Sequence, residues 1–137
     1  MSEQYKTAAK ALIEKGFNRK DLTAFDAFYG AGLVDHDLPP GLPEGLEGRK
    51  MLASAFFSAF PDLHVHIEDM FTEGDKLVAR WSAHGTHTGE LMGIPPTGRQ
   101  VSINGIVIDR FEDGRAVEIW ENIDMLGLMQ QLGVVPA

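Results

Sequence analysis

The chain contains no cysteine, which excludes disulfide bonds and thiolate chemistry. Positive charge is also scarce, because 12 Lys and Arg residues face 20 Asp and Glu residues, for a formal net charge of -8. Nucleic-acid-binding domains usually carry a basic stripe, and this sequence has none. No apolar run reaches the ~20 residues of a membrane span, and the first residues lack the pattern of a secretory signal. We therefore expect a cytoplasmic protein that acts on a small molecule, without nucleic acid or membrane as a partner.

The length of the chain predicts a single domain over residues 1–137, since 137 residues suffice for one hydrophobic core. Hydrophobic and charged fractions of 44% and 23% are typical of globular proteins.

Apolar residues in the first half recur at helical spacing. One helix is predicted over roughly residues 3–15, and a short second helix carries Leu22, Phe25 and Phe28 and ends near Gly30. Residues 33–36 are compatible with a short strand, and the Pro/Gly cluster after them with a loop. A third helical stripe ends at Pro61, because proline cannot continue a helix.

From Leu63 onward the apolar period changes to two, which indicates half-buried strands. Further strands are predicted over residues 76–84, 101–111 and 116–123, with a last helix over 125–132. Helices followed by long antiparallel strands indicate the α+β class. A twisted sheet that curls around the first helices would form a cone with a blind cavity.

The final strand carries the first candidate site. Its alternation places Trp120 and Asn122, with Asp124 after them, opposite the face of Ile119 and Ile123. An aromatic wall beside an amide and a carboxylate suits a small concave site, so Asp124 is the candidate reactive carboxylate. The alternative is that Asp124 is the N-cap of the helix that follows, and spacing alone favours this cap.

Other polar residues are candidates for the pocket. His36 lies between two aspartates, which would favour its charged form if they are close. Arg80 interrupts an apolar strand, so it either meets a carboxylate or anionic ligand or lies at an edge in water. Asn104 is a mid-strand amide, and Gly105 beside it suggests a bulge.

Histidine pairs give only weak metal signals. His64 and His66 share a face of one strand, but no third ligand is evident there, and solvent exposure explains them better. His84 and His87 have a superficially similar spacing, which the intervening glycine makes improbable as a metal site. The long segment from Thr88 to Arg99 fits a lid or a dimer contact.

Several motifs together resemble the SnoaL-like polyketide cyclase family of the NTF2-like superfamily. They are Val34-Asp-His-Asp37, His84-Gly-Thr-His-Thr-Gly89, Met92-Gly-Ile-Pro-Pro-Thr-Gly98, Gly105-Ile-Val-Ile-Asp-Arg110 and the segment from Glu118 to Gly133. The resemblance covers nearly the whole chain. It implies an NTF2-like cone in which a curved antiparallel sheet wraps around N-terminal helices and encloses a pocket.

The resemblance also implies a reaction that needs no metal and no organic cofactor. In the characterised cyclases a pocket aspartate removes a proton next to carbonyl groups, and the enolate closes a ring by intramolecular aldol addition. The matching base is Asp124, at the end of the Trp-x-x-x-Asp motif, and His36 matches a pocket histidine. The implied substrate-binding residues are Arg80, His84, Asn104, Trp120 and Asn122. Ile119 stands where the family often has a polar residue.

The implied ligand is a small hydrophobic or polyketide-like molecule, and the implied assembly is a homodimer formed through the outer sheet face. Two alternatives stay open. One is a non-catalytic binder with the same cavity. The other is a limonene epoxide hydrolase-like enzyme, which needs an Asp-Arg-Asp constellation around one water and would draw on Arg80, Asp109 and Asp124.

Overall fold

The computed structural model describes residues 2–136. Helical elements dominate its first half: α1 (Ser2–Ala11), the π-helical turn η1 (Leu12–Asn18), α2 (Thr23–Phe28) and α3 (Gly45–Ala59). Strand β1 (Tyr29–Asp35) lies between α2 and α3. The second half contains β2 (His64–Glu73), β3 (Lys76–Thr86), β4 (Gln100–Glu112), β5 (Arg115–Ile123) and α4 (Met125–Leu132).

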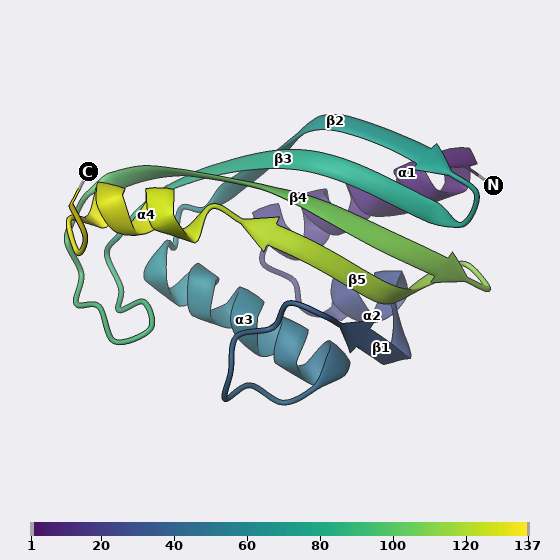
Figure 1. Ribbon diagram of the computed structural model, residues 1–137, viewed down its shortest axis with the longest axis horizontal. Coiled ribbons are helices and arrows are strands. Elements are labelled where there is room, and N and C mark those ends of the chain that lie inside the picture. Colours follow the sequence, from purple (N-terminus) through teal and green to yellow (C-terminus); the bar gives the residue numbers. More distant parts are fainter. Residues whose placement is uncertain (1, 137) are drawn as a thin grey trace.

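The five strands form one sheet in the order β1-β5-β4-β3-β2. Strands β2 to β5 pair antiparallel, and β1 joins the edge of β5 in parallel. In Figure 1 the long strands run side by side and curve over the helices, with α3 below the sheet and α4 at one end. This is the α+β arrangement that the sequence predicts, and it has the shape of an NTF2-like cone.

Helices cover the concave face of the sheet because their apolar stripes need a partner surface. One cluster joins α1, α2 and the base of the sheet, where the rings of Tyr5 and Phe111 stack at 4.2 Å between centroids. A second cluster joins the end of α3, the far half of the sheet and α4 around the fully buried Phe60 and Leu128. Between these two clusters lies the space that forms the site.

The observed boundaries follow the predicted ones closely in the second half of the chain. The helix α4 has the predicted bounds, and the ends predicted for the long strands agree within one residue, except that β3 continues two residues further, to Thr86. The predicted first helix continues to Asn18 through the wider turn of η1. Within residues 2–136, no helix is long and apolar enough to cross a membrane.

The loop after β3 is anchored by a buried histidine. The His87 side chain is fully buried, and its Nδ1 accepts a hydrogen bond from the Thr97 N–H at 3.2 Å. Leu91 of the same loop is also fully buried, in the second cluster. The loop is therefore held at these two points, while Met92, Gly93 and residues 95–99 are exposed.

Gly105 does not form the predicted bulge, because β3 and β4 keep an unbroken register through the pair Trp81 and Gly105. A Cβ atom at Gly105 would lie 2.6 Å from the Trp81 ring and 2.7 Å from the Asn122 carbonyl oxygen. The glycine instead leaves room for the indole to lie across β4. This close approach places Trp81 within reach of β5.

Candidate functional site

A cavity of about 100 Å³ lies between the concave face of the sheet and the helices. Most of its lining is apolar and comes from α1, η1, α3 and strands β2 to β5. The apolar residues include Leu12, Phe17, Ala53, Phe56, Val65, Leu77, Ala79, Ala83, Ile103, Val107 and Ile123. Small-molecule sites usually combine such walls with a few convergent polar groups.

Five lining residues carry polar groups: Tyr29 from β1, Arg49 from α3, Trp81 from β3, Asp109 from β4 and Glu121 from β5. Each lies in a run of residues that otherwise faces the interior. Asp109, for example, shares its strand face with the buried Ile103 and Phe111. The fold thus brings five segments that are distant in sequence to one polar cluster.

A buried ion pair forms the centre of this cluster. The Arg49 Nη1 lies 2.7 Å from Glu121 Oε1, and both side chains are only 9% exposed. Burial is the largest single influence and lowers the pKa of Arg49, but the charge and hydrogen bond of Glu121 act with Tyr29 and Asp35 to outweigh it, and the pKa of Arg49 rises. A buried pair of this kind is stable only when its other hydrogen-bonding positions are also satisfied.

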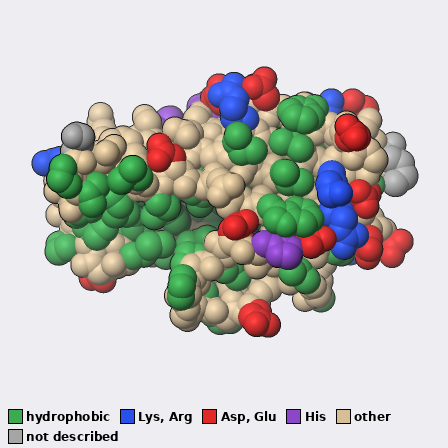
Figure 2. Space-filling model, in the orientation of Figure 1, with side chains coloured by type: hydrophobic (Ala, Val, Ile, Leu, Met, Phe, Trp, Pro, Cys, Tyr) green, Lys and Arg blue, Asp and Glu red, His purple; other side chains and the backbone are tan. Residues whose placement is uncertain are grey.

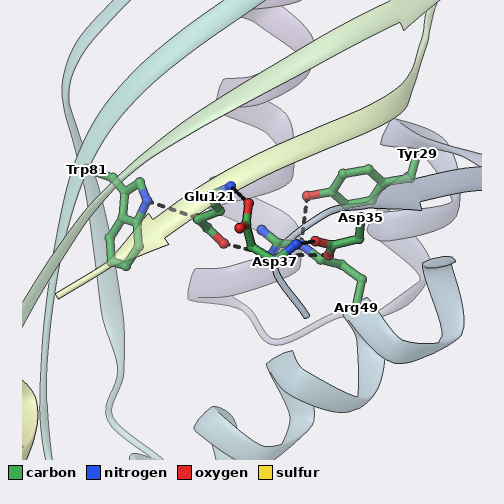
Figure 3. A network of polar contacts seen from close by, with 6 residues as sticks. All are labelled: Tyr29, Asp35, Asp37, Arg49, Trp81 and Glu121. Carbon is green, nitrogen blue, oxygen red and sulfur yellow. Dashed lines mark hydrogen bonds and ion pairs between the residues drawn. The ribbon is translucent and has the colours of Figure 1, made fainter. Parts of the chain in front are cut away.

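Neighbouring groups supply those hydrogen bonds (Figure 3). The Trp81 Nε1–H donates to Glu121 Oε2 at 3.1 Å, and the Arg49 Nε–H donates to the Tyr29 hydroxyl oxygen at 3.3 Å. The Glu121 N–H donates to Asp37 Oδ2 at 2.7 Å, just beyond the end of β1. Both carboxylate oxygens of Glu121 are therefore occupied, and its position is fixed from two sides.

Asp35 lies on the other side of Arg49. Its side chain is 1% exposed, and its Oδ2 lies 3.9 Å from Arg49 Nη1 without a hydrogen-bond partner. Burial raises the pKa of Asp35, and the N–H of Asp37 and the charge of Arg49 offset only part of that rise. Arg49 thus lies between two carboxyl groups, one paired tightly and one loosely.

Asp109 is the most perturbed carboxyl group of the cluster. It is 4% exposed, and its Oδ1 is buried without a hydrogen-bond partner. Burial raises its pKa from 3.8 to about 7, and the charge of Arg49 counteracts only part of this effect. A carboxyl group that lines an apolar cavity and exchanges its proton near neutral pH can act as a general acid or base.

A second, outer hollow of about 370 Å³ adjoins the cavity. It is lined by Asp35, Asp37, Pro39, Met92, Asn122 and Met125, together with residues that also line the inner cavity. Figure 2 shows this side of the molecule hollowed between α4 and α3, with hydrophobic side chains around the hollow. The outer hollow provides a route for a ligand to the polar cluster.

Asp124 does not face the cavity. It is exposed and is the N-cap of α4, where its Oδ1 accepts a hydrogen bond from the Gly127 N–H at 2.9 Å. The capping alternative is therefore confirmed, and the predicted position of Asp124 as a pocket base is corrected. The physical reason is that the alternation of β5 continues through Glu121 and Ile123 on the concave side.

His36 and Trp120 lie together on the outer face. Their rings stack at 5.0 Å between centroids, and His36 Nε2 lies 2.6 Å from Glu118 Oε2. Neither residue lines the cavity or the outer hollow. The structure therefore corrects their predicted placement in the pocket and gives them a partly exposed surface contact.

The remaining predicted residues also lie away from the cavity. The Arg80 side chain is 54% exposed, and its Nη2 lies 2.6 Å from Asp69 Oδ2. Arg80 thus meets a carboxylate, as one of the two interpretations of the sequence predicts, but it does so at the surface. His84 and Asn104 are exposed on the convex face, so neither contacts a ligand in the cavity. Asn122 is exposed as well, but it borders the outer hollow and is the one predicted residue near the site.

Three histidines gather on that convex face. The ring of His84 lies 5.6 Å from that of His64 and 6.1 Å from that of His66. Among residues 2–136, no group of three or more His, Asp or Glu residues has an arrangement that could hold a metal ion.

Comparison with known proteins gives consistent relatives. The family model of SnoaL-like polyketide cyclases matches residues 7–132. Aklanonic acid methyl ester cyclase DnrD from Streptomyces peucetius is 36% identical over 111 residues, which cover 77% of this chain and 72% of that protein. The structure of TsrD from Streptomyces laurentii superposes with a TM-score of 0.89 at 29% identity, over 97% of each chain. IdmH from Streptomyces antibioticus gives 0.81 at 33% identity, over 95% of this chain and 99% of that one.

Proposed function

The chain belongs to the SnoaL-like polyketide cyclase family, and from this membership we propose that it is a cofactor-free cyclase acting through an enolate. The observation that carries the proposal is Asp109, a buried carboxyl group with a pKa of about 7 in an apolar cavity. Its Oδ1 has no partner within the described residues and is therefore available to a ligand.

In the proposed reaction Asp109 takes a proton from a carbon between two carbonyl groups. Such a carbon is already fairly acidic, so a carboxylate with a pKa near the working pH is a suitable base. The resulting enolate carbon attacks a second carbonyl carbon of the same molecule and forms the ring bond. The alkoxide oxygen then takes up the proton that Asp109 removed, so that no atom is gained or lost.

The enolate oxygen needs a hydrogen-bond donor, and the cluster offers one. The Tyr29 hydroxyl accepts from Arg49, so its own O–H proton is free to donate. Burial raises the pKa of Tyr29, so this hydroxyl stays protonated at neutral pH. A donor fixed before the reaction and shielded from water stabilises developing negative charge strongly.

The substrate proposed is a small polyketide-like molecule. The name of the 36% identical relative, aklanonic acid methyl ester cyclase, supports an ester of a polyketide acid as the first compound to test. The mostly apolar cavity supports the same class, because it would bind rings and alkyl groups rather than ions.

The decisive experiment incubates the protein with aklanonic acid methyl ester and follows ring closure by chromatography. Asp109→Asn should lose turnover, because an amide cannot take up the proton, while Asp69→Asn on the convex face should keep it. Unchanged turnover by Asp109→Asn would refute Asp109 as the base. Saturable binding without turnover by the wild-type protein would favour a non-catalytic binder instead.

One observation favours epoxide hydrolysis as a second candidate function. A related arrangement of an arginine between two carboxyl groups is present, with Arg49 between Glu121 and Asp35, although a glutamate stands in place of one aspartate and Arg49 in place of the predicted Arg80. A hydrolase would incorporate one oxygen atom from ¹⁸O-labelled water into the product of an epoxide such as limonene oxide. A cyclase would leave that epoxide unchanged.

A further inference from the structure

The site consists of two compartments that meet at a ring of shared residues. Arg49, Leu52, Phe56, Glu121 and Ile123 line both the inner cavity and the outer hollow. The Arg49–Glu121 ion pair is therefore the polar part of the boundary between them. A ligand that occupies both compartments must pass this ion pair.

The inner cavity has room for only a compact apolar group. Its volume of about 100 Å³ is smaller than the roughly 150 Å³ of an engineered cavity that binds benzene in another protein. A single small ring or a short alkyl chain fits this space, and a fused polycycle does not. The outer hollow is more than three times as large, at about 370 Å³.

The charges at the boundary disfavour an anionic ligand. One guanidinium group, Arg49, faces three carboxyl groups, namely Glu121, Asp35 on the outer side and Asp109 on the inner side. Glu121 already neutralises Arg49 at 2.7 Å, so no cation among these four groups is left for a ligand carboxylate. An unpaired anion in such surroundings would meet both desolvation and like-charge repulsion.

From these compartments we infer that the substrate is an uncharged molecule with one compact apolar end. That end occupies the inner cavity, the larger remainder fills the outer hollow, and the reacting carbons lie beside the Arg49–Glu121 boundary near Asp109. The inference rests on the proposed function for treating the ligand as a substrate. The preference for small, neutral apolar groups in the inner cavity is a property of binding alone.

Benzene and benzoate, which share a ring and differ in charge, test the inference without any turnover assay. Binding is followed by amide chemical shifts of ¹⁵N-labelled protein at pH 8. Ala79 lines only the inner cavity, and Ala79→Leu fills it, whereas Ala27→Leu on the exposed side of α2 is a matched control. If Ala79→Leu fails to fold, Ala53→Val fills the same cavity from α3 by a smaller amount.

Benzene should shift the amide signals of cavity-lining residues in the wild-type protein. Its affinity should fall by about tenfold or more in the filled variant and should stay at the wild-type value in Ala27→Leu. Benzoate should bind the wild-type protein about tenfold or more weakly than benzene, which corresponds to about 1.4 kcal/mol. Equal benzene affinity in the filled and wild-type proteins would overturn the inner-cavity assignment. Equal affinity for benzoate would overturn the exclusion of anions. Benzene binding without cyclisation of any ester would refute the proposed function but leave this binding preference intact.

Discussion

Replacing Asp109 with asparagine should change how the stability of the protein depends on pH. The folded-state pKa of Asp109 is about 7, against 3.8 for an unperturbed aspartate. The folded state therefore holds this proton more tightly than the unfolded state. The resulting contribution to stability is complete below the unfolded pKa and is lost as pH rises through about 7.

The magnitude follows from the two pKa values. A rise from 3.8 to about 7 corresponds to roughly 4 kcal/mol over the whole range, of which about 3 kcal/mol falls above pH 5. Asp109 is 4% exposed, so solvent screening reduces this figure little, but relaxation of the surroundings makes it an upper bound. The neutral amide of the Asp109→Asn variant has no charge to bury, so this variant should not show the same loss.

Urea unfolding of both proteins between pH 5 and pH 8.5 measures this difference. Across that range the wild-type protein should lose up to about 3 kcal/mol relative to Asp109→Asn. A fixed offset is also expected, because the buried amide lacks hydrogen-bond partners and costs about 1–3 kcal/mol at every pH. Asp69→Asn on the exposed face should run parallel to the wild type. If the free energy of unfolding of Asp109→Asn also runs parallel to that of the wild type across this pH range, the burial argument is refuted, and Asp109 loses its main support as a base.

Three further predictions follow from the same structure. Asp124→Ala should lower the free energy of unfolding by about 1 kcal/mol through loss of the N-cap, whereas Asp124→Asn, which can still cap the helix, should keep most of the wild-type stability. If Asp124→Asn abolishes turnover in a stable protein, Asp124 does more than cap α4. Arg49→Met should destabilise by about 3–5 kcal/mol at pH 8, because it leaves Glu121 buried without its partner. The loss should be smaller at pH 5, because Arg49 also lowers the pKa of Asp35 and of Asp109, and its charge matters most where these groups are ionised. Urea unfolding at both pH values measures this, and equal effects would contradict it. The homodimer expected through the convex face should dissociate in Ile106→Lys, since that side chain is 50% exposed there; a wild-type monomer mass by light scattering would rule the dimer out.

The fold could be predicted largely from periodicity. The change from a helical to a two-residue period at Leu63 marks the start of the sheet half, and turn residues such as Glu73-Gly74-Asp75 mark its first hairpin. The parallel pairing of β1 with β5 could not be deduced in this way, because it depends on docking between segments that are distant in the chain, such as Tyr29 and Ala116. Local patterns carry no information about that contact.

The candidate site was predicted poorly for a definite physical reason. Alternation divides the residues of β5 into two faces, but it does not say which face is concave. The face richer in polar residues, with Trp120 and Asn122, is the expected choice for a ligand site. In the structure the ligand space is itself apolar, so it lies on the face of Ile123, and its chemistry depends on single polar residues such as Glu121 within that face.

A usable signal was nevertheless present in the sequence. Arg49 falls on the same helical stripe as Leu52, Ala53 and Phe56, and Asp109 falls in phase with the buried Ile103 on β4. A charged residue at an apolar phase costs free energy unless it is paired or functional. Single charged residues at apolar positions, rather than clusters of polar residues, therefore identify Arg49, Asp109 and Glu121.

The ion pair at the boundary joins residues 72 positions apart, and the Asp37 contact to the same glutamate spans 84. Neither contact can form until α3, β1 and β5 have docked, and contacts so distant in sequence close slowly during folding. A partly folded chain would present a hydrated surface that does not distinguish neutral from charged ligands. Ligand affinity would therefore serve as a sensitive gauge of how completely the two halves of the polypeptide have come together.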